Sequence, residues 1–209
     1  MKDTPMKEHI VASIRVYLVL TLLLGVAYPL VVFGIGQAAF REKANGSFLR
    51  MKERESDRIV GSALIGQNFH SQNLFHPRPS AAGDAGYDPT ASGGTNLGPT
   101  SKKLADSVRD AVAAARAENP GVGGDVPADL VTSSASGLDP HISPENARWQ
   151  VPRVAKAAGI PESELIAMIE RRTEGRFLGV FGEPRVNVLR LNMDLLERLE
   201  RPVSVSVSR

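Results

Sequence analysis

The chain contains no cysteine, and this absence excludes several kinds of chemistry. Its 209 residues can form no disulfide, no thiolate nucleophile and no cysteine-ligated metal site. Histidine is scarce too, and the four histidines do not fall at the spacing of metal ligands; they are His9, His70, His76 and His141. The sequence therefore predicts no metal centre and no redox function.

An excess of one charge sign is also missing. The 25 lysines and arginines face 23 aspartates and glutamates, which leaves a formal charge of +2 spread along the chain. Proteins that bind nucleic acid through the phosphate backbone usually carry a clustered basic surface. The charge distribution therefore predicts that this chain does not bind nucleic acid.

The sequence does contain one long uncharged run. Between Arg15 and Arg41 lie 25 residues without a charged side chain. At about 1.5 Å per residue, a helix of this length spans a hydrocarbon core of roughly 30 Å. A cleaved signal peptide is the alternative, because a small-x-small triplet stands at residues 36–38, but the apolar part of a signal is only about 7 to 15 residues long. The length favours an uncleaved transmembrane helix over residues 16–40.

Proline and glycine interrupt this run. Pro29 removes one helical hydrogen bond, which membrane helices tolerate when a neighbouring group satisfies the freed carbonyl. Gly25, Gly34 and Gly36 allow a partner helix to approach closely, although glycine is also simply common in such helices. We expect residues 10–40 to dock against a partner subunit.

Charge and composition divide the chain into five parts. We predict an N-terminal segment, a transmembrane helix, a charged connecting arm, a soluble domain and a frayed tail, at residues 1–15, 16–40, 41–58, 59–200 and 201–209. Helical and strand patterns mix in the fourth part without regular alternation. The predicted fold is therefore a single transmembrane helix followed by one soluble α+β domain.

Within this domain, apolar spacing and capping residues predict the individual elements. A helix is expected from Lys102 to about residue 117, a second after the Ser143-Pro144 cap up to Gly159, and a third from Pro161. Short strands are expected between residues 59 and 75 and at 129–132, 177–181 and 186–191, with a terminal helix at 194–200.

Residues 80–100 form a long segment rich in glycine. Its part from Gly93 to Thr100 approaches a phosphate-binding loop in spacing, but Pro99 stands where the lysine is needed and lacks a backbone N–H. We therefore interpret it as a turn that leads into a helix capped by Thr100 or Ser101. The few charges and the presence of Tyr87 favour an ordered loop that contacts something.

Serine, aspartate and histidine cluster at residues 133–143. Asp139 and His141 lie near four serines, Ser133, Ser134, Ser136 and Ser143, which leaves a Ser/His/Asp hydrolase as the alternative function. Local turns and caps explain the same residues, because serine and aspartate commonly bond to nearby backbone. Activity of the isolated domain on esters would favour the hydrolase.

A series of segments resembles the C-subunit family of the Kdp-type potassium-transporting ATPases. These segments are GSALIGQNF (61–69), FHPRPS (75–80), YDP (87–89), SGGTNLGP (92–99), VPADLVT (126–132), SGLDPHISP (136–144), RVAK (153–156) and GEPRVNVLRLN (182–192). Their order and spacing extend the resemblance over roughly residues 10–196, including the predicted span.

The resemblance implies a non-catalytic accessory subunit of a high-affinity potassium pump in the bacterial inner membrane. Its partners would be a P-type ATP-hydrolysing subunit, a channel-like potassium subunit and a small membrane subunit. The family is described as a catalytic chaperone that raises the affinity of the P-type subunit for ATP. If this domain contacts ATP, Gln150 could bond to an adenine edge and Trp149 could stack, although Trp149 also fits an apolar core position.

The orientation of the domain is predicted differently by two observations. Three cations precede the span and five follow it within fifteen residues, so the positive-inside rule alone places the domain in the cytoplasm. Long domains translocate largely regardless of charge, and the resemblance implies that the domain lies outside. We follow the resemblance, which implies that residues 1–15 are a cytoplasmic segment and that residues 59–200 are a soluble accessory domain outside. Since ATP is cytoplasmic, an external domain would act on ATP affinity only through the membrane helices.

Overall fold

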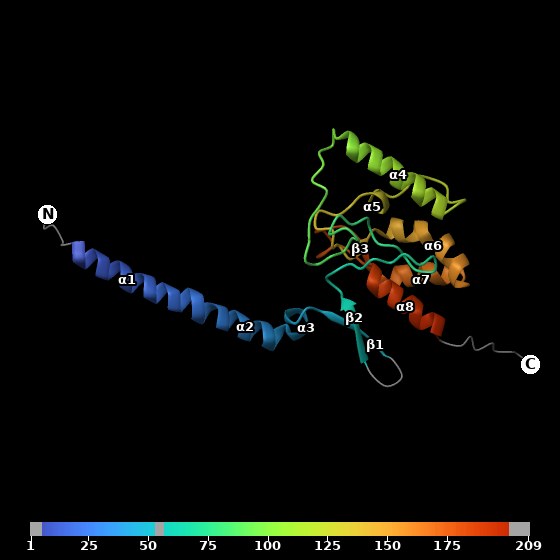
Figure 1. The fold of residues 1–209 in the computed structure, drawn as a ribbon. Coiled ribbons are helices and arrows are strands. Elements are labelled where there is room, and N and C mark those ends of the chain that lie inside the picture. The colour runs from blue at the N-terminus through green and yellow to red at the C-terminus, as the bar shows by residue number, and fades with distance from the viewer. Residues whose placement is uncertain (1–5, 53–56, 201–209) are drawn as a thin grey trace, which may run out of the picture. The chain divides into compact units, whose positions relative to one another are not determined.

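The structure is a computed structural model that describes residues 6–52 and 57–200 (Figure 1). The chain forms two compact units, Met1–Ser47 and Phe48–Arg209. The predicted tail at 201–209 and the first five residues of the predicted segment 1–15 lie outside the described residues.

The N-terminal unit is dominated by one continuous helical run. It consists of α1 (Met6–Leu22), the π-helical turn η1 (Leu23–Ala27) and α2 (Tyr28–Ala39). In the part of the chain that the structure describes, this run of 34 residues is the one helix long and apolar enough to cross a membrane, and an 18-residue window within it has a mean hydropathy of 2.5. It begins ten residues before the predicted span.

The π-helical turn has a direct cause in Pro29. A proline within a helix cannot donate a backbone hydrogen bond, and its ring crowds the carbonyl four residues earlier, here that of Gly25. The backbone N–H of Tyr28 bonds to the carbonyl of Leu23, five residues back, which widens the turn immediately before the proline. The helix thus continues through Pro29.

A short helix follows this run. Phe40 leaves helical geometry, with φ −134° and ψ 36°, and α3 (Arg41–Ala44) comes next. The side-chain amide of Asn45 donates to the carbonyl of Arg41 at 2.6 Å and to the side chain of Gln37 at 3.1 Å, which fixes the turn after α3. The stretch predicted as a charged arm is therefore partly helical.

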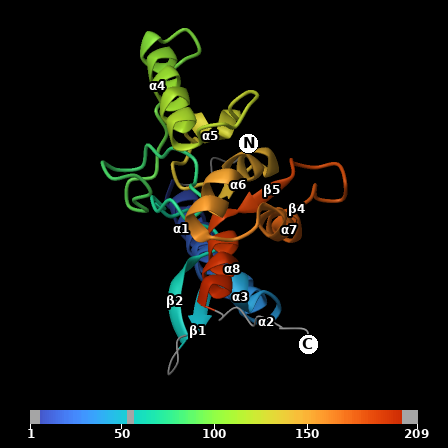
Figure 2. The ribbon, with the colours of Figure 1, turned by 90° about the vertical axis from the view of Figure 1, so that its right-hand side faces the viewer.

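The second unit is an α+β domain, as predicted (Figure 2). It contains an antiparallel hairpin, β1 (Phe48–Lys52) with β2 (Asp57–Ser62), and a three-stranded antiparallel sheet in the order β3-β5-β4. The strands of that sheet are β3 (His141–Ile142), β4 (Thr173–Glu174) and β5 (Arg185–Asn187). The helices are α4 (Lys102–Glu118), α5 (Ala128–Val131), α6 (Pro144–Ala158), α7 (Glu162–Arg172) and α8 (Val188–Glu200).

The main core lies among α6, α7, α8 and the small sheet. Its fully buried members include Phe75, Ile142, Val154, Leu165, Ile169, Val186, Leu191 and Leu195. A second, smaller apolar cluster joins α4 and α5 to Trp149 on α6. Helix α6 therefore takes part in both clusters and connects the two halves of the domain.

The three predicted helices between residues 102 and 172 agree with the structure, whereas the terminal helix, predicted at 194–200, begins at Val188. The hydroxyl of Ser101 accepts a hydrogen bond from the backbone of Leu104 at the start of α4, and Ser143 caps α6 in the same way. Gly159 ends α6 in the left-handed region, with φ +68°.

Several predicted strands are wrong. Residues 129–132 belong largely to α5, and between residues 59 and 75, all of which the structure describes, the only strand is the end of β2. Of residues 186–191 only two are strand, because the side chain of Asn187 accepts the backbone N–H of Arg190 and caps α8. Residues 177–181 form a tight turn closed by a bridge between Phe177 and Phe181.

Candidate functional site

Gln150, the residue predicted to contact adenine, lies in the interior of the domain. Its side chain is 1% exposed. Its oxygen accepts the backbone N–H of His76 at 2.8 Å and Nη2 of Arg153 at 2.7 Å. Its nitrogen donates to the carbonyl of His76 at 3.1 Å and to the side chain of Asn146 at 2.8 Å. Four hydrogen bonds occupy the two donors and two lone pairs of this amide.

A second amide holds the preceding residue in the same way. The backbone N–H of Phe75 donates to Oδ1 of Asn192, and Nδ2 of Asn192 donates to the carbonyl of Phe75, both at 2.9 Å. Two consecutive backbone units are thus held by side chains from α6 and α8. Buried backbone groups outside helices and sheets need such partners, and here amides replace a neighbouring strand.

Arg153 extends this arrangement toward the start of the same segment. Its Nη1 donates to the carbonyls of Gln72 at 2.7 Å and Leu74 at 3.0 Å. Burial lowers the pKa of this guanidinium, although Glu118 acts in the opposite direction. Residues 72–76 are therefore fastened at four carbonyls and two N–H groups. We call this segment with Asn146, Gln150, Arg153 and Asn192 the amide clamp.

The ring of His76 lies at the edge of the amide clamp. Its Nε2 is 3.1 Å from the carbonyl of Ser71, and its Nδ1 is 3.3 Å from a carboxylate oxygen of Glu118. Burial and the nearby charge of Arg153 lower the pKa of His76, which outweighs the opposing effect of Glu118.

The glycine-rich loop is ordered, as predicted, and packs against residues 133–138. The hydroxyl of Ser80 donates to the carbonyl of Gly137 at 2.6 Å and accepts the N–H of Tyr87 at 2.8 Å. A Cβ on Gly94 would lie 2.9 Å from the carbonyl oxygen of Ala135. Gly94, one of the glycines that approach a phosphate-binding loop in spacing, therefore serves close packing within the domain.

Asp139 joins this loop region to the sheet. Its carboxylate is 3.2 Å from Nη1 of Arg78 and accepts the backbone N–H of His141 at 3.0 Å. Burial acts to raise the pKa of Asp139, but the hydrogen bonds from His141 and the charges of His141 and Arg78 lower it overall. Asp139 therefore serves as a structural ion-pair partner.

The arrangement needed by the hydrolase alternative is not assembled. The hydroxyl of Ser143 donates to Asp129 at 2.9 Å and caps α6. The hydroxyls of Ser134 and Ser136 accept the backbone N–H groups of Gly137 and Leu138. None of these bonds reaches the His141 ring, which lies 3.3 Å from Asp139. Ser134, Ser136 and Ser143 act in turns and caps, the other explanation of this cluster.

Trp149 lies in the second apolar cluster beside Ala115 and Val131 and is 8% exposed. Its Nε1 is buried and has no hydrogen-bond partner among the described residues.

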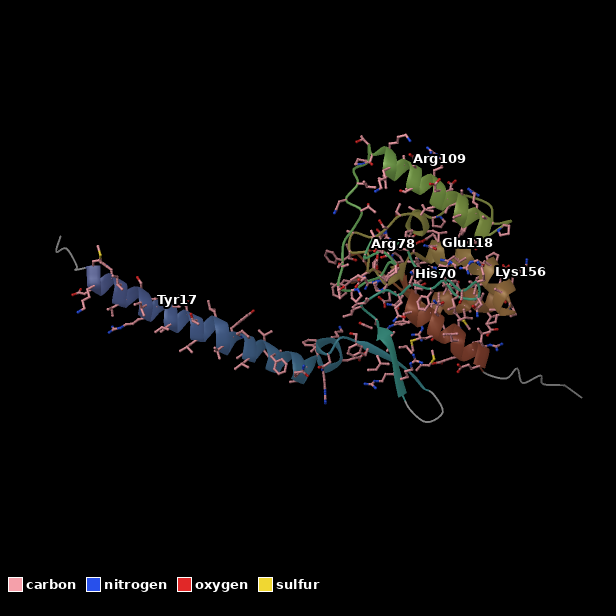
Figure 3. The ribbon with its side chains drawn as sticks, in the orientation of Figure 1. Tyr17, His70, Arg78, Arg109, Glu118 and Lys156 are labelled. Atoms are coloured by element: carbon pink, nitrogen blue, oxygen red, sulfur yellow. The ribbon has the colours of Figure 1, made fainter. Side chains whose placement is uncertain are left out.

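Two clefts open near the amide clamp and α4. One, of about 730 Å³, is lined by residues that include Glu118, Arg153 and Lys156, and the other, of about 370 Å³, lies between α4 and residues 68–87. Figure 3 labels Glu118 and Lys156 of the first cleft and His70 and Arg78 of the second. Neither Gln150 nor Trp149 lines these clefts.

Sequence reasoning singled out Gln150 but missed the rest of the amide clamp. Asn146, Gln150 and Arg153 recur at helical spacing on α6. This spacing could have predicted that the three polar side chains share one face of the helix. The burial of Asn192 could not be predicted from the sequence, because an isolated asparagine in an amphipathic helix is usually exposed.

The fold and these contacts define a class of protein: an α+β domain carried behind an apolar helix of membrane-spanning length. Residues 10–197 match the family described as K+-transporting ATPase, c chain, abbreviated KdpC. The chain belongs to this family.

Curated relatives agree with this assignment. The potassium-transporting ATPase KdpC subunit of Myxococcus xanthus is 53% identical over 89% of this chain and 86% of the relative. The protein of the same name from Allorhizobium ampelinum is 54% identical over 91% of this chain and 96% of the relative. That of Geotalea uraniireducens is 50% identical over 94% of this chain and its own full length.

Proposed function

We propose that this chain is the accessory subunit of a high-affinity, ATP-driven potassium uptake pump of the bacterial inner membrane. Its partners are a P-type subunit that hydrolyses ATP, a channel-like subunit that carries potassium and a small membrane subunit. The chain itself catalyses no reaction. The observation that carries the proposal is the family match over residues 10–197, which includes both the apolar helix and the α+β domain.

The apolar helix supports a place in the membrane. Its large side chains are exposed along the whole run, among them Leu18, Leu24 and Phe33 at 54%, 58% and 64%. Water would oppose exposure of so much apolar surface, whereas lipid or the helices of a partner subunit would accommodate it. We propose that this helix crosses the inner membrane once and docks against a partner subunit.

The α+β domain is proposed to lie on the extracytoplasmic side. The test is addition of a protease to intact spheroplasts. Loss of the domain beyond Arg41 is expected, and protection until the membrane is broken would place the domain in the cytoplasm.

We further propose that the chain assists assembly and raises the affinity of the P-type subunit for ATP, with the effect transmitted through the membrane helices. Full occupancy of the Gln150 amide supports this route over direct contact, because adenine would have to displace the backbone of His76. The test compares Gln150→Ala with Asn192→Ala, which removes the other buried amide that holds residues 72–76. In assembled complexes, an unchanged apparent KM for ATP is expected for both variants. A higher KM for Gln150→Ala alone would favour adenine contact by Gln150 and Trp149.

The proposal as a whole is tested by co-expression with the other three subunits and purification through a tag on this chain. We expect all four subunits to co-purify and the preparation to hydrolyse ATP when potassium is added. Recovery of this chain alone from membranes that contain the other subunits would contradict the proposal.

A further inference from the structure

The turn between β4 and β5 exposes an unusual amount of apolar surface. Phe177, Leu178, Val180 and Phe181 are 71%, 76%, 70% and 64% exposed. We call residues 177–181 the apolar turn. In Figure 2 the loop that carries it extends outward beyond α7. Water-soluble surfaces rarely place four large apolar side chains together in this way unless the patch meets a partner.

The backbone of the apolar turn is preformed. The N–H of Phe177 donates to the carbonyl of Phe181 at 2.8 Å, and the N–H of Phe181 donates back at 2.9 Å. Leu178 occupies the left-handed region, with φ +53°, at a cost of about 1 to 2 kcal/mol for a residue with a Cβ. The side chain of Leu178 is 76% exposed, so it gains little from its own domain to offset this strain.

Two ion pairs brace the base of the turn. Arg176 contacts Glu183 at 2.7 Å and Arg185 contacts Glu174 at 3.0 Å. The base therefore carries two positive and two negative charges and has no net charge. Loops that bind anionic lipid usually combine apolar residues with an excess of lysine and arginine, which is missing here.

We infer that the apolar turn is the element by which this chain docks into an apolar recess on the extramembrane surface of another subunit of the pump. This inference rests on the proposed function. Rigid aromatic side chains on a preformed backbone are typical anchors, because little conformational entropy is lost when they are buried. Phe177 and Phe181 bond to each other through their backbones, so the recess receives side chains instead of adding a strand.

The absence of cysteine permits a direct test. A Leu178→Cys variant of the full chain carries a single thiol, and Ala113→Cys on α4 is an exposed control. Maleimide labelling is followed by the mass of this chain, in nanodiscs that contain either the four-subunit complex or one copy of the chain alone. We expect the thiol at position 178 to react at least about tenfold more slowly in the complex than in the chain alone, because anchors at an interface are shielded from water. The control is expected to react equally in both.

Three other labelling results would each overturn the inference. Equal reactivity of position 178 in both samples would show that the turn is free in the pump. Protection in the chain alone would point to lipid, and protection that appears only with two copies per disc would point to a second copy. Failure of the control variant to assemble with the other subunits would instead count against the proposed function.

A second variant measures the energetic contribution of the turn. Phe177→Ser/Phe181→Ser is expected to keep the fold, since both side chains are exposed, and to weaken retention of the chain in the complex by about tenfold or more. Leu64→Ser, at an equally exposed leucine, is the control. Unchanged retention of the double variant would contradict the inference.

Discussion

The side-chain amide of Gln150 and the backbone of His76 exchange two hydrogen bonds, at 2.8 and 3.1 Å, across 74 residues of sequence. Asn192 exchanges two more with Phe75. The segment from Gln72 to His76 has no strand partner in the described chain, and buried side chains of α6 and α8 satisfy its polar groups. The amide clamp thus joins an irregular segment to the helical core.

Removal of the Gln150 amide is expected to destabilise the domain. Gln150→Ala leaves the N–H and carbonyl of His76 and one nitrogen of Arg153 without this partner, at a cost of about 2 to 4 kcal/mol. The fluorescence of Trp149, the single tryptophan, reports unfolding in denaturant. The control Arg148→Ala, at an exposed position, should stay within about 0.5 kcal/mol of the parent. A similarly small effect of Gln150→Ala would show that the clamp contributes little.

Gly66 is expected to tolerate no side chain. A Cβ there would lie 2.4 Å from the ring of Tyr87 and 2.8 Å from the carbonyl oxygen of Asp139. Gly66→Ala should therefore lower the free energy of unfolding by about 2 kcal/mol or more, because the packed ring and backbone have to move. Gly98→Ala is the matched control, since a Cβ at Gly98 meets nothing within 4 Å. If thermal unfolding gave equal midpoints for both variants, the close packing at Gly66 would be disproved.

The sequence predicts those parts of the structure that depend on local signals. The caps at Ser101 and Ser143 and the left-handed Gly159 locate helix ends, because each bonds within its own turn. The strand prediction at residues 186–191 fails because Asn187 caps α8, whose mostly apolar start at residues 188–191 resembles a strand. The partners of Gln150 could not be predicted, since His76 lies 74 residues away and only the tertiary fold brings the two together.

Asp139 is expected to make the domain sensitive to acid. Its pKa in the folded state lies below the ordinary 3.8, so the folded state favours the carboxylate. The stability that this group contributes is complete above its unfolded pKa and is lost as the pH falls through the folded value, below about pH 4. Asp139→Asn should be about 1 to 3 kcal/mol less stable at neutral pH, because it loses a charged partner of Arg78.

Unfolding measured between neutral and acidic pH checks this expectation. The parent chain should lose stability below about pH 4 more steeply than Asp139→Asn, since the variant has no proton to bind at this position. Parallel pH profiles for the two proteins would show that Asp139 does not contribute to acid sensitivity.

The apolar helix is expected to provide specific contacts as well as an anchor. Replacement of residues 16–40 by a leucine-alanine span of equal length removes Pro29, the π-helical turn and the glycines but keeps the chain in the membrane. Co-purification of the other subunits should fall by about tenfold, because the small residues no longer allow close helix contact. Full recovery of the complex with the replaced span would show that the helix is only a tether.

Potassium uptake by cells at low external potassium tests the central claim most directly. The cells express the other three subunits with or without the full chain. The account predicts that uptake requires the full chain, and that the complex purified without it, if any forms, has a higher apparent KM for ATP. Equal uptake and equal ATP affinity with and without this chain would contradict its role as a subunit of the pump.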